Sequence, residues 1–263
     1  MQKECGRVLS PAYFYIGLGD MFTFKDKIII ISGASSSIGI ELIKDFLNDE
    51  PIIYALVKSE ESYKLLNGMF QNQIYTYICD LSDIKNIIDL PRKLKIEKVD
   101  HIINCIGMSI DGNIEQLDEN EFEEMFKVNF FSIVNLIKSF SSCFVKGSSI
   151  LNIASSLGVR CIPNSIGYSV SKAALIHFSK CLALEYAYRG IRVNCISPGY
   201  FKSKMTAKII EDSKLHSSVL NKIPNHRLLE VEEIIPFVKL LISDSGSYIT
   251  GANVIMDGGL SCW

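Results

Sequence analysis

Short runs of β-branched and other apolar residues alternate along this chain with longer stretches in which apolar residues recur every three or four positions. The short runs predict buried strands, and the longer stretches predict amphipathic helices. The predicted strands are residues 27–32, 52–57, 74–79, 101–104, 149–154, 192–196 and 252–256. The predicted helices are residues 38–48, 60–69, 83–94, 119–145, 165–188 and 231–242. This alternation predicts an α/β fold, a doubly wound parallel sheet with helices on both faces.

Two segments depart from the alternation. Residues 200–227 are rich in Lys, Ser and His and lie between a strand and the last helix, so we expect a substrate loop there. Residues 1–22 precede the first strand, and Pro11, Gly17 and Gly19 interrupt their apolar part, which makes a poor signal peptide. We interpret residues 1–22 as an N-terminal extension, either a flexible one or a consequence of start-site choice. Residues 23–263 then form a single domain.

Composition places this 263-residue chain among ordinary globular proteins. It is 48% hydrophobic and 21% charged with a net charge of -2, which excludes disordered, collagenous and strongly basic nucleic-acid-binding classes. No apolar run near a strand approaches the ~18 residues of a membrane helix. The eight cysteines are scattered, and the four His show no metal spacing. We therefore expect a cytoplasmic protein with reduced thiols, no metal, and no nucleic-acid or membrane partner.

The turn after the first strand carries small residues that suit a bound pyrophosphate. Small side chains let the backbone approach a phosphate, and the N-terminus of the following helix favours its charge. Only two glycines are present, so the motif alone is as compatible with a plain tight turn as with G-x-G-x-x-G. The predicted cofactor contacts in this turn are Gly33, Ser35, Ser36, Ser37, Ile38 and Gly39.

The spacing of Tyr168 and Lys172 is the sharpest chemical signal in the chain. Positions four apart share one face of a helix, so the phenol and the ammonium lie side by side. A nearby cation favours the phenolate, so we expect Lys172 to lower the pKa of Tyr168 from its usual ~10. Thirteen residues before Tyr168, a strand ends at Ser155, which places a hydroxyl at the carboxyl edge of the sheet. Ser156 is the fallback for this hydroxyl.

These segments together resemble the short-chain dehydrogenase/reductase family. The first turn matches T-G-x-x-x-G-x-G with serine at two positions, residues 194–199 match N-x-I-x-P-G, and residues 104–107 resemble N-N-A-G. The resemblance spans residues 25–259. It implies a single-domain Rossmann fold and an NAD(P)-dependent oxidoreductase that moves a hydride between the nicotinamide and a carbonyl or secondary-alcohol carbon.

The resemblance also implies roles for individual residues. In the reduction direction Tyr168 donates a proton, Lys172 lowers the pKa of that phenol and holds the nicotinamide ribose, and Ser155 hydrogen-bonds the reacting oxygen. Asn129 anchors the proton relay, although a buried amide that bends its helix explains it equally well. Further cofactor contacts are implied for Asp80, Leu81, Asn104, Gly107, Ile196, Pro198, Gly199 and Ser203. Asp80 is equally well placed to cap a helix.

The end of the second strand bears on the choice of cofactor. NAD specificity usually shows as an acidic residue here, but the chain has Val57 followed by Lys58. Lys58 is suited to pair with a 2′-phosphate, so NADP(H) is favoured over NAD(H). The alternative is that Lys58 is an ordinary solvated surface charge.

The substrate is less well defined. General similarity favours the 3-oxoacyl-[acyl-carrier-protein] reductase branch, but Leu184 stands where that branch usually has Arg, and only Lys146 and a patch at Lys202, Lys204 and Lys208 offer positive charge. A sugar, a steroid or another small secondary alcohol or ketone remains an alternative. So does a non-catalytic nucleotide sensor, which Ser37 favours and the complete set of site residues opposes.

The resemblance also implies self-association, as a homotetramer or a homodimer. The last part of the long helix carries Phe178, Leu182 and Tyr186, which suit either an oligomer face or packing on the sheet.

Overall fold

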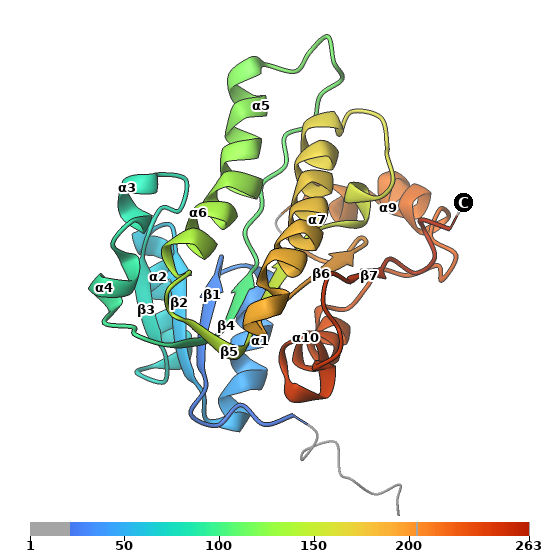
Figure 1. Cartoon of the computed structure of the whole chain (residues 1–263). Coiled ribbons are helices and arrows are strands. Elements are labelled where there is room, and N and C mark those ends of the chain that lie inside the picture. The colour runs from blue at the N-terminus through green and yellow to red at the C-terminus, as the bar shows by residue number, and fades with distance from the viewer. Residues whose placement is uncertain (1–21, 204, 263) are drawn as a thin grey trace, which may run out of the picture.

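A seven-stranded parallel sheet forms the centre of the computed structural model, which describes residues 22–203 and 205–262 (Figure 1). The strand order is β3-β2-β1-β4-β5-β6-β7. The strands are β1 (Ile28–Ser32), β2 (Ile52–Val57), β3 (Tyr75–Ile78), β4 (Val99–Asn104), β5 (Phe144–Ile153), β6 (Arg192–Pro198) and β7 (Asn253–Met256). The order reverses between β1 and β4, which confirms the doubly wound, single-domain fold. All of the predicted extension except Phe22 lies outside the described residues.

Helices cover both faces of this sheet (Figure 1). The α-helices are α1 (Ser37–Phe46), α2 (Glu60–Phe70), α3 (Ile84–Ile87), α4 (Leu90–Leu94), α5 (Glu119–Phe126), α6 (Ser132–Ser139), α7 (Ile166–Tyr186), α8 (Ala207–Glu211), α9 (Ser213–Leu220) and α10 (Ile235–Ile242). Single turns of 3-10 helix are η2 (Leu47–Asp49), η4 (Ser156–Gly158), η5 (Ala187–Arg189), η6 (Val231–Ile234) and η7 (Asp244–Gly246), and η3 (Lys127–Phe131) is a π-helix.

The two faces of β1 show why the chain folds this way. Ile29 and Ile31 lie in a core with α1, α2 and α10, whereas Ile30 lies in the core beneath α4, α6 and α7. All three side chains are fully buried. Because successive strand residues point to opposite faces, a strand covered on both sides has to be apolar throughout.

The helix predicted over residues 119–145 is wrong only from residue 140 onward. Helix α6 ends at Ser139, and β5 begins at Phe144, five residues earlier than predicted. Phe140 and Phe144 are four residues apart and both buried, so a turn followed by a strand imitates helical spacing. The register of β5 against β4 also shifts after Phe144, and Gly147 has a φ of +93°. Because of this irregularity, the early part of β5 lacks the regular pattern of apolar residues by which a strand is predicted from sequence.

Two other predictions need correction. The helix predicted over residues 83–94 is two short helices, α3 and α4, because Pro91 lacks an N–H and lies in the first turn of a new helix. The segment 200–227 is not a plain loop, since it contains α8 and α9. Within the described part of the chain, no helix is both long and apolar enough to cross a membrane.

Candidate active site

Most of the predicted site residues lie near the carboxyl ends of β1, β4, β5 and β6, around the point where the strand order reverses, whereas Lys58, Asp80 and Leu81 follow β2 and β3. The loops after β4 and β5 join each other, because Gly112 and Ser165 form a parallel bridge and the Gly112 N–H donates to the Asn164 carbonyl at 2.9 Å. Ligands of doubly wound folds bind in the crevice at this reversal.

Both glycines of the first turn are required by close backbone packing. Gly33 has a φ of +66°, and a Cβ there would lie 2.8 Å from the Cys105 carbonyl carbon. A Cβ on Gly39 would lie 2.6 Å from the Ala34 oxygen. Ser37, which replaces a glycine of the family pattern, is the first residue of α1 and has no positive φ. The replacement therefore causes no backbone strain.

The same turn exposes hydrogen-bond donors that suit a phosphate. Ser36 caps α1, and its hydroxyl accepts from the Gly39 N–H at 3.1 Å. Among the described residues, no acceptor pairs with the backbone N–H groups of Ser35, Ser37 and Ile38. Unpaired N–H groups at a helix N-terminus form an anion site, so this turn fits the pyrophosphate of a dinucleotide.

Lys58 and Asp80 form an ion pair at the ends of β2 and β3. Their charged atoms are 3.3 Å apart, and 65% of the Lys58 side chain is exposed. Asp80 Oδ1 also accepts from the Ser82 N–H and hydroxyl at 2.9 and 2.7 Å. Burial tends to raise the pKa of Asp80, but the bonds from Ser82 and the charge of Lys58 lower it overall. Asp80 thus caps its own turn and pairs with Lys58 at the end of β2, the strand next to β1.

Asn104 is committed to the interior of the sheet. Its Oδ1 accepts from the Ser32 hydroxyl at 2.8 Å, and its Nδ2 donates to Asn152 Oδ1 at 2.7 Å. Asn152 in turn donates to the Ser179 hydroxyl of α7 at 2.8 Å. This buried chain of hydrogen bonds fixes β1, β4, β5 and α7 relative to one another. The side chain of Asn104 therefore stabilises the sheet beneath the site.

Lys172 lies deep in the site and is held by two carbonyl oxygens. Its Nζ donates to Ile153 O at 3.0 Å and to Ile106 O at 3.2 Å, which ties α7 to the ends of β5 and β4. The same Nζ lies 5.9 Å from the centre of the Tyr168 ring. Burial lowers the pKa of Lys172 to about 8. The ammonium therefore stays largely protonated at neutral pH in a place with little access to solvent.

The pKa of Tyr168 departs from the expectation. Burial raises the pKa of the phenol above its ordinary value, and the hydrogen bond with Ser155 opposes that rise only in part. Lys172 does not lower it, because the ammonium is directed at two carbonyls and burial disfavours the phenolate. The expected drop in the pKa of Tyr168 is therefore wrong for the protein alone. At neutral pH the phenol is protonated and able to donate.

Ser155 lies at the carboxyl end of β5 and is nearly buried. Its Oγ accepts from the Leu157 N–H at 3.1 Å, and its hydroxyl also bonds with Tyr168. Ser156 instead begins the short helix η4, and its side chain is more deeply buried. The structure therefore brings Ser155, Tyr168 and Lys172 together and leaves the fallback residue outside the group.

Asn129 lies in the π-helical turn η3 and is fully buried. Its Oδ1 accepts from the Met108 N–H at 2.8 Å, and its Nδ2 donates to Met108 O and to the Ser171 hydroxyl, both at 2.9 Å. The Ser171 hydroxyl donates to the Tyr168 carbonyl at 2.7 Å. The amide therefore shapes its own helix and also lies two hydrogen bonds away from Tyr168.

Sequence reasoning missed Ser171 as a member of this group. It lies on the buried face of α7 with Lys172 and Ser179. Polar residues on the otherwise apolar face of a predicted helix indicate a buried polar site, so the sequence could have revealed Ser171. The backbone of Met108 gives no comparable signal, because any residue supplies the same N–H and carbonyl.

The other predicted contacts are spread over several strands and loops, and Gly107 lies against Lys172. A Cβ on Gly107 would lie 3.3 Å from Lys172 Nζ, and one on Gly199 would lie 2.8 Å from Asp257 Cα. Ser203 bonds to Thr206 at 2.9 Å through its N–H. Pro198 ends β6, Ile196 lies fully buried within that strand, and Leu81 is buried after β3.

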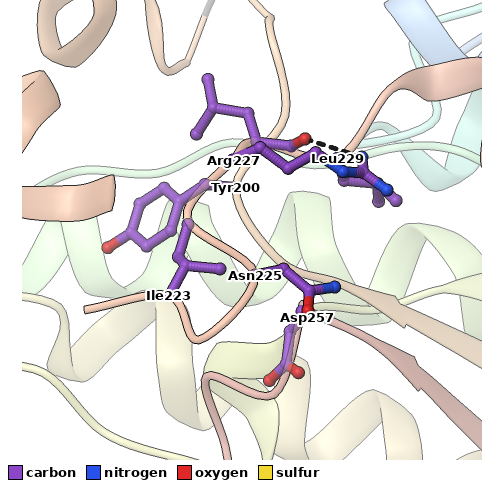
Figure 2. Close-up of a pocket in the computed structure, with 8 residues that line it drawn as sticks. Tyr200, Ile223, Asn225, Arg227, Leu229 and Asp257 are labelled. Atoms are coloured by element: carbon purple, nitrogen blue, oxygen red, sulfur yellow. Dashed lines mark hydrogen bonds between the residues drawn. The ribbon is translucent and has the colours of Figure 1, made fainter. Parts of the chain in front are cut away.

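A small cavity of about 40 Å³ adjoins the end of β6. Its lining includes Tyr200, Asn225, Arg227 and Asp257 (Figure 2). Arg227 forms a bidentate ion pair with Glu233 at 2.6 and 2.7 Å, which fastens the end of the 200–227 segment to η6. Among the described residues, His, Cys, Asp and Glu side chains form no group of three that is placed to hold a metal ion.

The chain matches known proteins over nearly its whole length. Residues 33–261 match a family model described as enoyl-(acyl carrier protein) reductase. The chain is 30% identical over 241 residues to the 3-oxoacyl-[acyl-carrier-protein] reductase FabG of Buchnera aphidicola subsp. Schizaphis graminum, with coverage of 90% of this chain and 98% of that protein. It is 29% identical over 244 residues to the FabG of Thermotoga maritima, with coverage of 90% and 98%.

Solved structures share the fold. The Pseudomonas aeruginosa RhlG/NADP active-site complex superposes with a TM-score of 0.86 at 24% sequence identity, covering 92% of this chain and 98% of that one. A short-chain dehydrogenase/reductase from Serratia marcescens BCRC 10948 superposes with a TM-score of 0.83 at 22% identity, covering 90% and 99%.

Proposed function

The chain belongs to the short-chain dehydrogenase/reductase family of oxidoreductases, and from this premise we propose that it interconverts a carbonyl and a secondary alcohol with NADP(H). One observation carries the proposal: Ser155, Tyr168 and Lys172 lie together at the carboxyl edge of the sheet, with the phenol bonded to the serine and the ammonium buried beside it. When bound, the dinucleotide would supply or accept the hydride.

The protein's own residues would move the proton. In the reduction direction Tyr168 donates its phenolic proton to the developing alkoxide, and Ser155 hydrogen-bonds the same oxygen. Lys172 would hold the nicotinamide ribose, and its ammonium lies 5.9 Å from the centre of the Tyr168 ring. Asn129 positions Tyr168 through Ser171, which fixes the start of α7.

The predicted contacts would hold the cofactor as follows. The free N–H groups of Ser35, Ser37 and Ile38 would bind the pyrophosphate, while Gly33, Ser36 and Gly39 shape the turn. Lys58 would pair with the 2′-phosphate of NADP(H), since its ammonium is exposed at the end of β2, the strand next to β1. The remaining contacts would come from Leu81, Gly107, Ile196, Pro198, Gly199 and Ser203, with Asp80 at the adenine edge and Asn104 supporting the sheet.

A 3-oxoacyl thioester is the substrate class that the family relationship favours. The FabG proteins of Buchnera aphidicola and Thermotoga maritima, at 30 and 29% identity, are 3-oxoacyl-[acyl-carrier-protein] reductases by name. Leu184, which stands in place of an arginine of that branch, is 81% exposed and offers no charge to an acidic carrier protein. A small sugar, steroid or other secondary alcohol is therefore the second candidate. A nucleotide sensor without turnover is the third, although the complete group of Ser155, Tyr168 and Lys172 argues against it.

Oxidation of NADPH and NADH by the purified protein tests this proposal. We expect turnover of a short 3-oxoacyl thioester with NADPH, and slower turnover with NADH because Lys58 finds no 2′-phosphate to pair with. Absorbance at the nicotinamide band follows both reactions, with a nucleotide-linked keto sugar and simple ketones as the other substrates. Faster turnover with NADH would contradict the role of Lys58. Tight NADPH binding without turnover of any substrate would favour the sensor.

Self-association is the remaining part of the proposal. Leu182 is buried in the core, and Phe178 and Tyr186 are partly buried against it. The outer side of the same helix instead exposes Val170 and Leu184, and Tyr188 follows at 87% exposure. We propose that this outer apolar surface joins two copies of the chain.

Leu184→Asp is expected to weaken this association at least about 100-fold, because each copy would bury a carboxylate without a partner. Light scattering after size exclusion measures the mass, which for the wild-type chain should be a multiple of 29.4 kDa. The matched control is Ile88→Asp, an exposed apolar residue between α3 and α4. A wild-type mass of a single chain, or an assembly that Leu184→Asp leaves intact, would refute this interface.

A further inference from the structure

Arg160 lies on the loop that connects two members of the proposed site. The loop begins at Ser155, passes through the short helix η4 and ends at α7, which carries Tyr168. The backbone N–H of Arg160 donates to the Ser156 carbonyl at 3.0 Å, which fixes the main chain at Arg160. Arg160 is therefore anchored a few residues away from the reacting group.

The guanidinium of Arg160 has no acceptor. Its Nη1 is shielded from solvent, and within the described part of the chain no oxygen accepts a hydrogen bond from it. The other four described arginines all have acceptors. Arg92 pairs with Asp89, Arg189 donates to two carbonyls, Arg192 donates to carbonyls at the end of α10, and Arg227 pairs with Glu233. Arg160 as a whole is partly exposed, but its shielded Nη1 is a donor without a partner, which is costly and calls for an acceptor from elsewhere.

Two other loops approach Arg160 at the same sheet edge. Tyr200 directly follows Gly199 after β6, and Asp111 lies on the loop that bridges to Ser165. Burial raises the pKa of the Tyr200 phenol, while the charge of Arg160 acts against that rise and the charge of Asp111 adds to it. Figure 2 shows the Tyr200 ring turned away from Asn225 and Asp257. The guanidinium and a carboxylate thus both lie within electrostatic reach of one half-buried phenol.

We propose that Arg160 determines substrate specificity by donating a hydrogen bond from Nη1 to a second acceptor oxygen of the substrate, separate from the oxygen that is reduced. The acceptor is a planar carbonyl or carboxylate oxygen, as in a 3-oxoacyl thioester or a keto acid. Asp111 supplies a balancing negative charge nearby, so the site is not restricted to anions. This inference rests on the proposed function, because it places Arg160 beside the same reacting carbonyl.

Arg160→Met tests the proposal, because it keeps an apolar stem and removes the donor. With NADPH we expect kcat/KM to fall at least about 10-fold for an acetoacetyl thioester and for acetoacetate, which carry a second oxygen. For 2-pentanone, which lacks it, the change should stay within about threefold. Arg160→Lys should recover part of the loss. Equal losses on all three ketones, or no loss on any, would overturn the proposal.

A binding measurement separates this inference from the proposed function. Calorimetry of acetoacetate binding to the NADP-loaded protein, and of 3-hydroxybutyrate binding to the NADPH-loaded protein, measures binding without reaction, and both should show a loss of affinity in Arg160→Met. The matched control, Arg92→Met, removes an exposed arginine of α4 and should bind both compounds like the wild type. If no ketone is turned over, the proposed function fails, yet weakened binding in Arg160→Met alone still supports Arg160. Unchanged binding, or none by the wild type, overturns it.

Discussion

Tyr168→Phe is expected to lower turnover at least about 1,000-fold while NADPH binding stays within about threefold. The change removes one oxygen atom, the proton donor of the proposed reaction, and leaves the ring in place. The pKa of Tyr168 is raised by burial, so the phenol is protonated at neutral pH and its proton is available. Steady-state NADPH oxidation measures the turnover, and fluorescence titration measures NADPH binding.

A second tyrosine on the same helix supplies the matched control for this experiment. Tyr186 is also half-buried, and burial likewise raises its pKa, but its ring packs with Phe144 and Arg189 on the core side of α7. Tyr186→Phe should therefore keep near-normal turnover. Near-normal turnover in Tyr168→Phe itself would remove the phenol from the reaction and with it the proposed proton donor.

The fold was largely predictable because its signals are local. The isoleucines of β1 are buried on both faces of the sheet, and the strand predicted over residues 52–57 matches β2 at both ends. Prediction failed where local patterns coincide with another structure. Phe140 and Phe144 keep a helical spacing across a turn, and Pro91 starts a second helix inside a continuous apolar pattern. Only tertiary packing distinguishes these cases.

The site was predictable as a set of positions rather than as an electrostatic environment. The spacing of Tyr168 and Lys172 places both on α7, and Ser155 follows the carboxyl end of β5. The spacing does not reveal that Lys172 is held by the Ile106 and Ile153 carbonyls, or that burial outweighs the hydrogen bond with Ser155 in setting the pKa of Tyr168. Whether Arg160 Nη1 finds an acceptor depends on how the neighbouring loops pack around it, so no sequence motif predicts that it lacks one.

Lys172→Met is expected to lower turnover about 1,000-fold and to change the pH dependence of stability. Burial lowers the pKa of Lys172 to about 8, whereas an unfolded chain keeps it near 10.5. Between these values the unfolded chain binds a proton that the folded protein does not, so the folded protein gains stability as pH rises from 8 to 10.5. This gain amounts to about 3 kcal/mol and should be absent in Lys172→Met.

Urea unfolding at pH 7.5 and at pH 10.5 measures this difference, because the other titrating groups are shared by the wild type and the variant and cancel in the comparison. Lys180→Met is the matched control, since Lys180 is exposed on the same helix and its removal should leave both turnover and the pH dependence unchanged. The two carbonyls that Lys172 leaves behind cost the same at both pH values and do not disturb the comparison. If the free energy of unfolding depended on pH equally in the wild type and in Lys172→Met, burial would not lower the pKa of Lys172. Normal turnover in that variant would remove Lys172 from the reaction.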